Sequence, residues 1–144
     1  MARTAVITGA SGGIGSEVAR ELARRGWRIA VVGRNTSRTE EVARMVDGVP
    51  FVCDFDRLDD VRELAETLDT RYERIDAIVN NAGGIVAQRQ DSADGHELTL
   101  QRNVLSAVVL TERLVPKLMQ TRGRVIHTSS LVSRFGRIAI NDVG

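Results

Sequence analysis

The 144-residue sequence has few of several residue types: one cysteine (Cys53), one lysine (Lys117), one tyrosine (Tyr72) and two prolines. A lone cysteine cannot form an internal disulfide and is typical of a reducing compartment. The first apolar run, "AVITGA" at residues 5–10, is too short for a signal-peptide core or a membrane span. We therefore expect a cytoplasmic protein with no membrane segment.

An excess of one charge is also lacking, because the net charge is only +1. The basic residues are nearly all arginine and form no tract, so nothing points to nucleic acid as a partner. Hydrophobic residues make up 42% and charged residues 27% of the chain, as in folded soluble proteins. A chain of this length predicts one domain, residues 1–144.

Short apolar runs alternate with helical patterns along the whole chain. The runs predict strands at residues 4–9, 28–33, 49–55, 74–80 and 123–130. Apolar spacing predicts helices at residues 14–26, 38–46, 58–68 and 95–119, the last kinked or restarted at Pro116. Apolar strands separated by helices indicate an α/β fold with a parallel sheet covered on both faces. Right-handed crossovers then favour a Rossmann-like doubly wound sheet of about five strands in the order 3-2-1-4-5.

The segment "TGASGGIG", residues 8–15, lies between the first strand and the first helix. Gly9, Gly13 and Gly15 permit a tight turn, close approach of a ligand and tight packing of helix on sheet. The free N–H groups and the dipole at the start of the helix favour an anion such as pyrophosphate. The alternative is an ordinary glycine turn, which the position between strand and helix disfavours.

The second strand ends in "VVGRN", with Gly33 where an NAD-binding site would carry an acidic residue for the ribose 2′-hydroxyl. Arg34 follows, and a guanidinium suits a 2′-phosphate through charge-assisted, often bidentate hydrogen bonds. The alternative is a solvated surface arginine. The pattern therefore favours NADP(H) over NAD(H), with Arg38 as a possible second contact.

Four stretches in this order, "TGASGGIG", "CDFD" at 53–56, "NNAG" at 80–83 and "GRVIHTSS" at 123–130, resemble the short-chain dehydrogenase/reductase family. Residues 91–118 and 123–138 are similar to its retinol-dehydrogenase-like branch. The resemblance implies an NADP(H)-dependent oxidoreductase that transfers a hydride between nicotinamide and a small-molecule carbonyl or alcohol. It also implies a homo-oligomer.

The resemblance assigns a cofactor role to residues in each of these loops. Asp54 would hydrogen-bond the adenine, although it could equally cap the helix that begins near Leu58. Asn80, Ala82 and Gly83 would border the ribose and pyrophosphate, and Asn81 would brace the sheet. The cofactor-binding set is Gly9, Ser11, Gly13, Ile14, Gly15, Arg34, Asp54, Asn80, Ala82 and Gly83.

Two further residues match the catalytic positions of the family. Asn103 would help to hold a water in the proton relay, and an asparagine within an apolar helix needs buried partners; an ordinary core amide is the alternative. Ser130 would polarise the substrate carbonyl and is preferred to Ser129, although both hydroxyls could merely satisfy a strand end. His96 and His127 have no spacing that suits a metal, so no metal site is expected.

The family also needs a Tyr-x-x-x-Lys motif after the serine, and neither residue follows Ser130 in this sequence. The commonest family spacing would put the tyrosine at Val143, which would make the chain a non-catalytic dinucleotide-binding or scaffolding module. The retinol-dehydrogenase-like branch has a longer insertion, which would put the motif beyond residue 144. We favour the second interpretation, a C-terminally incomplete dinucleotide-binding domain that lacks the last strands of the family.

Overall fold

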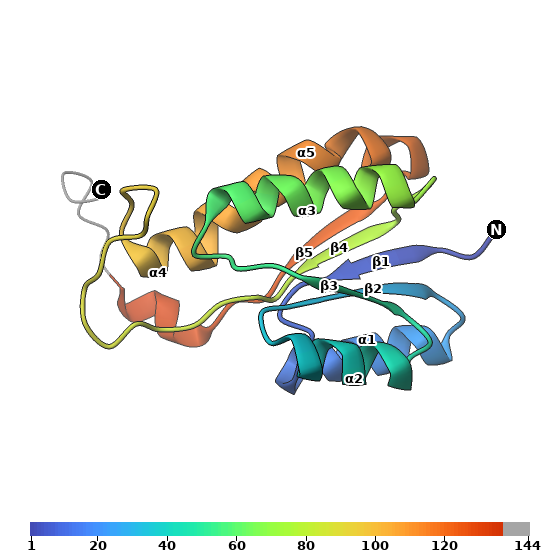
Figure 1. The fold of residues 1–144 in the computed structure, drawn as a ribbon, viewed down its shortest axis with the longest axis horizontal. Coiled ribbons are helices and arrows are strands. Elements are labelled where there is room, and N and C mark those ends of the chain that lie inside the picture. Colours follow the sequence, from blue (N-terminus) through green and yellow to red (C-terminus); the bar gives the residue numbers. More distant parts are fainter. Residues whose placement is uncertain (137–144) are drawn as a thin grey trace.

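Five parallel strands form one sheet with helices on both faces in the computed structural model, which describes residues 1–136 (Figure 1). The strands are β1 (Thr4–Ile7), β2 (Arg28–Gly33), β3 (Val49–Val52), β4 (Ala77–Asn80) and β5 (Arg124–His127). Their order, β3-β2-β1-β4-β5, confirms the predicted doubly wound α/β fold. Several strands are shorter than predicted, because polar loops that carry the site follow their carboxyl ends.

Two helices cover each face of the sheet. Figure 1 shows α1 (Gly13–Arg24) and α2 (Thr36–Met45) on one side, and α3 (Leu58–Arg71) and α5 (Ser106–Thr121) on the other. Successive strand residues face opposite sides, so Val6 packs under α3 and α5, while Ala5 and Ile7 pack under α1 and α2. Two separate cores hold the sheet between its helix layers, and the strands need to be apolar on both faces.

The long helix predicted at 95–119 is divided differently from the expectation. A single turn, α4 (Leu98–Leu100), leads into a π-helical segment, η1 (Gln101–Leu105), and then into α5. Pro116 lies inside α5, which is not restarted there but continues to Thr121 and ends at Arg122, with φ +53°. The irregular part of this helix is therefore η1, and π-helical turns are frequent at functional sites.

β5 differs from the other strands because all four of its residues are exposed. It pairs with β4 along one edge, with Val79 opposite Ile126. Val125 and Ile126 remain 37% and 44% exposed, although the neighbouring strand β4 is buried along its whole length. A short 3₁₀ helix, η2 (Leu131–Phe135), follows it.

Candidate functional site

A cavity of about 240 Å³ opens at the carboxyl ends of the strands, beside the point where the chain reverses its direction along the sheet, between β1 and β4. Parallel α/β sheets bind their ligands at this switch point. Its walls come from the loops after β1, β2, β3 and β4 and from η1. Five separate segments therefore meet around one cavity.

Close packing requires two glycines of the loop "TGASGGIG", Gly9 and Gly15. Gly9 has φ +63°, and a Cβ there would lie 2.8 Å from Cα of Ala82. A Cβ on Gly15 would lie 2.4 Å from the carbonyl oxygen of Gly9 and 2.7 Å from Nδ2 of Asn81. Gly13 has φ +54° but open space around it, so only its conformation favours glycine there.

The start of α1 has the features of an anion site. The helix begins at Gly13, and its N-cap, Gly12, provides no side-chain hydrogen bond to the first N–H groups. Those groups remain available to a ligand. Ser11 lines the cavity, whereas Ile14 is 65% exposed and lies outside the lining. Of the predicted binding residues of this loop, Gly9 and Ser11 line the cavity, Gly13 and Ile14 are exposed at the helix start, and Gly15 is buried.

Gly33 occupies the position where an NAD-binding site would carry its acidic residue, and neighbouring atoms leave little room there for a side chain. A Cβ on Gly33 would lie 2.3 Å from Oγ1 of Thr39 and 2.8 Å from Cβ of Ser11. A larger side chain would have to displace the side chains of Thr39 and Ser11. Arg34 is consequently the first side chain after β2 that can reach a ligand in the cavity.

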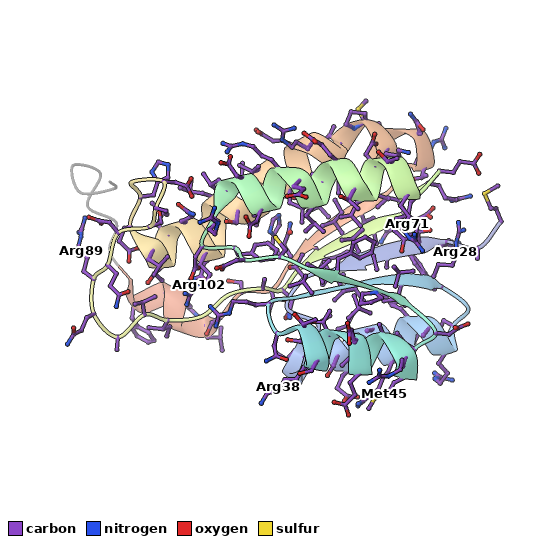
Figure 2. The ribbon with its side chains drawn as sticks, viewed as in Figure 1. Arg28, Arg38, Met45, Arg71, Arg89 and Arg102 are labelled. Carbon is purple, nitrogen blue, oxygen red and sulfur yellow. The ribbon has the colours of Figure 1, made fainter. Side chains whose placement is uncertain are left out.

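Two arginines border the cavity on this side. Arg34 is 68% exposed, and its Nη1 lies 3.7 Å from Oδ2 of Asp56. Arg38 lies at the start of α2, where its backbone N–H donates to Oδ1 of Asn35, the N-cap residue. Figure 2 shows Arg38 and Arg102 on helical segments from opposite sides of the sheet, both toward the end that carries the cavity.

Asp54 lines the cavity and does not cap α3. Its Oδ1 accepts from the backbone N–H of Asp56 at 3.1 Å, which folds the loop into a local turn. The N–H of Leu58, at the start of α3, instead donates to Oδ2 of Asp94 at 2.9 Å. The helix-capping alternative for Asp54 was therefore wrong, because a distant loop supplies the cap.

The "NNAG" segment divides into a structural half and a cavity half. Asn80 is buried, and its Nδ2 donates to Oγ1 of Thr111 in α5, at 3.0 Å. Asn81 donates to the carbonyl oxygens of Thr8 and Gly9, at 3.2 and 3.3 Å, and so makes the bracing contacts that the resemblance implied. Ala82 and Gly83 line the cavity, but Asn80 does not.

Asn103 is exposed, which contradicts the alternative that it is an ordinary core amide. It lies in η1, where its Oδ1 accepts from the N–H of Gly84 at 2.8 Å and its Nδ2 donates to the carbonyl of Gly84 at 2.9 Å. A Cβ on Gly83 would lie 2.6 Å from Oδ1 of Asn103. The amide is satisfied by a loop backbone, and that loop is the continuation of the cavity wall.

Ser130 and Ser129 are exposed and follow β5 at the same end of the sheet. Thr128 ties their segment to the neighbouring loop: its N–H donates to the carbonyl of Asn80, and its Oγ1 donates to Oδ1 of Asn81, both at 3.0 Å. The catalytic roles of Ser130 and Asn103 remain predictions. Val143, the alternative tyrosine position, lies outside the described residues.

The single tyrosine and the single lysine lie away from this site. Tyr72 is buried in the core just after α3, and burial raises the pKa of its hydroxyl. Lys117 donates from Nζ to the carbonyl oxygen of Tyr72 at 2.6 Å, and lies 3.7 Å from Oδ1 of Asp69. These contacts lie at the end of α3, before β4 begins, so neither side chain reaches Ser130.

The sequence analysis missed a pair of charges in the cavity wall, Asp56 and Arg102. The guanidinium of Arg102 donates from Nε to Oδ1 at 2.7 Å and from Nη2 to Oδ2 at 2.5 Å. Hydrogen bonding to Arg102, with further attraction from Arg34, holds the pKa of Asp56 below its usual range although burial opposes this. The two residues are 46 positions apart, so no local pattern in the sequence links them.

Within residues 1–136, no group of histidine, cysteine, aspartate or glutamate side chains is arranged to hold a metal ion. Cys53 is buried, and burial raises its pKa to about 12, so its thiol is not activated. Over the same part of the chain, none of the helices has the length and apolar character needed to cross a bilayer.

The family model for short chain dehydrogenases matches residues 3–141. The chain belongs to the short-chain dehydrogenase family. DnrU of Streptomyces sp. (strain C5), named for daunorubicin C-13 ketoreductase activity, is 44% identical over 98% of this chain and 50% of its own length. Human retinol dehydrogenase 13 is 33% identical over 98% of this chain and 45% of its own length. The chain thus spans about half the length of the curated relatives it matches.

Solved structures of the family superpose well on this chain. An uncharacterized protein from Mycobacterium paratuberculosis, 35% identical, gives a TM-score of 0.82 over 97% of this chain and 50% of its own. An alcohol dehydrogenase from Thermococcus sibiricus in complex with 5-hydroxy-NADP, 28% identical, gives 0.75 over 92% of this chain and 60% of its own. The resemblance to this family, including proteins named retinol dehydrogenases, is confirmed.

Proposed function

We propose that this chain is the cofactor-binding part of an NADP(H)-dependent oxidoreductase that interconverts a carbonyl and an alcohol. The observation that carries the proposal is the end of β2, where Gly33 has no room for an acidic side chain and Arg34 and Arg38 border the cavity. Family membership and the NADP derivative bound by the Thermococcus sibiricus relative support it.

The residues around the cavity fit the adenosine and phosphate groups of a dinucleotide in their chemistry. The uncapped start of α1 offers N–H groups to a pyrophosphate, and the two arginines offer charge-assisted hydrogen bonds to a 2′-phosphate. Asp54 would accept from the adenine, with Ala82 and Gly83 beside the adenosine ribose. When bound, the cofactor would exchange a hydride with the substrate, while Asn103 and Ser130 would position the proton relay and the carbonyl.

We further propose a lipophilic small-molecule substrate, a cytoplasmic location and self-association. Three valines on the outer face of α5 and η1 are 38 to 47% exposed: Val104, Val108 and Val115. Together with the exposed β5, they leave apolar surface that a second copy could cover. Sedimentation velocity should show a dimer or larger species at micromolar concentration. A single monomeric species across that range would contradict self-association.

A second candidate function is a dinucleotide-binding module without catalysis. It is favoured by the sequence from 1 to 144, whose single tyrosine and lysine lie far from Ser130 and next to each other. Both candidates predict cofactor binding, and they differ in turnover. Oxidation of NADPH with a panel of lipophilic aldehydes and ketones separates them, since the module would bind NADPH without consuming it.

The proposed cofactor is tested by NADPH and NADH titrations monitored by nicotinamide fluorescence. NADPH should bind more tightly than NADH, and Arg34→Gln should weaken NADPH binding about tenfold, the scale of one charge-assisted contact. Arg25→Gln is the matched control, because Arg25 is an exposed arginine at the far end of α1, paired with Glu21. Tighter binding of NADH by the unmodified chain would overturn the NADP(H) assignment, and binding of neither would overturn both candidates.

A further inference from the structure

Two arginines from different segments lie near Asp56: Arg34, just after β2, and Arg102, in η1. Arg102 donates to both carboxylate oxygens of Asp56, and the side chains of Arg102 and Asp56 are only 19% and 21% exposed. Arg34 lies farther away, with a single approach of 3.7 Å to Oδ2, and is itself 68% exposed. The carboxylate is therefore neutralised mainly by Arg102, which leaves most of the donors of Arg34 facing solvent.

We propose that Arg102 is a specificity-determining residue for the 2′-phosphate of NADP(H) and that it acts through Asp56. By clamping the carboxylate, Arg102 keeps Arg34 available to the phosphate and removes a negative charge from the wall that the phosphate must approach. This inference rests on the proposed function, because it assigns a partner to the arginine that would bind the cofactor.

The physical reason is a competition for Arg34. A partly buried carboxylate needs a counter-ion, and after Arg102 the nearest described cation is Arg34. Without Arg102, Asp56 would draw Arg34 into a shorter ion pair, and that pair would compete with the cofactor phosphate for the same guanidinium. Charges within a few ångströms of one another in a partly desolvated cavity interact strongly enough to change affinity about tenfold.

NADH has a 2′-hydroxyl at this position and carries no charge that the carboxylate would repel. A free carboxylate can even accept a hydrogen bond from a ribose hydroxyl, as the acidic residue of NAD-binding sites does. The proposed role of Arg102 therefore predicts a change in the ratio of the NADPH affinity to the NADH affinity. A residue that only stabilised the loop would lower both affinities together.

The experiment measures binding of NADPH and NADH to the full chain and to three variants. Arg102→Gln should weaken NADPH binding about tenfold and leave NADH within about twofold. Asp56→Asn should leave NADPH binding at least as tight as in the unmodified chain. Asp56→Asn combined with Arg102→Gln should restore the NADPH-to-NADH ratio, because the competing charge is gone. Thermal unfolding of each variant shows whether it is folded at the titration temperature.

The outcomes separate this inference from the proposed function. Equal loss of both affinities in Arg102→Gln, or no restoration in the double variant, would overturn the role of Arg102. If Arg102→Gln does not fold, the Asp56→Asn variant decides, since a large loss of NADPH binding there contradicts the competition. If the single variant Arg34→Gln binds NADPH as tightly as the unmodified chain, the proposed function is contradicted, whatever the result for Arg102.

Discussion

The two ends of the sheet use the same residue types for different purposes. At the amino end, Asp76 is 8% exposed and accepts from Arg74 and from the N–H of Thr4, while Lys117 donates to the carbonyl of Tyr72. At the carboxyl end, Arg34 and its neighbours face an open cavity. Figure 2 shows the contrast in position, with Arg28 and Arg71 at one end and Arg38 and Arg102 at the other.

This comparison shows that the exposure of hydrogen-bond donors distinguishes the candidate site from the other end of the sheet better than the residue types do. At the amino end, Asp76 is buried and its contacts with Arg74 and Thr4 tie the start of β1 to the residue before β4. At the carboxyl end, the Arg34 side chain is 68% exposed beside the cavity, and neighbouring backbone or side-chain atoms lie too close for a Cβ at Gly9, Gly15 and Gly33. The carboxyl end is therefore suited to ligand contacts, whereas the Asp76 contacts contribute to folding.

The largest expected effect comes from Gly15→Ala, which tests whether the cavity end is also structural. The new Cβ would meet the carbonyl oxygen of Gly9 at 2.4 Å and Nδ2 of Asn81 at 2.7 Å, so the start of α1 must move away from the loops after β1 and β4. We expect a loss of about 3 kcal/mol in the free energy of unfolding, as for an overpacked core, together with loss of NADPH binding. Urea unfolding measures the first and fluorescence titration the second.

Gly12→Ala is the matched control for that prediction. Gly12 lies three residues earlier in the same loop, with φ 172° and no atom within 4 Å of an added Cβ. Its unfolding free energy should stay within about 0.5 kcal/mol of the unmodified chain. An equal loss of stability in both variants would show that the loop tolerates no side chain anywhere, and that the close approach at Gly15 is not the cause.

Sequence patterns were sufficient for the strand order and for the glycine-rich turn between β1 and α1, because both depend on short, contiguous signals. β1 and β2 are apolar runs that end at glycine-bearing turns, and α1 follows with its own apolar spacing. The absence of an acid at Gly33 was also visible in the sequence. Its reason, the closeness of Thr39 and Ser11, needed the three-dimensional packing.

The interactions between loops could not be predicted from the sequence. Asp94 caps α3 from 36 positions away, and Asp56 pairs with Arg102 across 46 positions. Such pairs depend on how two loops meet above the sheet, and no periodicity records that. The exposure of Asn103 could not be predicted either, because the rule for amides in apolar helices assumes regular helical spacing and Asn103 lies in a π-helical turn.

Asp76→Asn tests the amino end and should have a smaller effect. The variant keeps an oxygen for the N–H of Thr4 but loses the charge that pairs with Arg74, which should cost about 1–2 kcal/mol of unfolding free energy at pH 7. NADPH binding by the folded variant should not change, because Asp76 is not one of the residues that line the cavity. Asp69→Asn is the control, since Asp69 is 55% exposed and lies 3.7 Å from Lys117.

The pH dependence of stability should distinguish the same two variants. Burial acts to raise the pKa of Asp76, but hydrogen bonds from Arg74 and the Thr4 N–H outweigh it and hold that pKa below the usual range. A carboxyl whose pKa is lower in the folded state stabilises the fold above its unfolded pKa, about 3.9, and loses that contribution as the pH falls toward the folded value. The unmodified chain and Asp69→Asn should therefore lose stability below about pH 4 more steeply than Asp76→Asn. If Asp76→Asn and the unmodified chain lose stability in parallel as the pH falls, the Asp76–Arg74 pair does not stabilise the amino end of the sheet. The difference between the two ends would then be only that the carboxyl end carries the cavity.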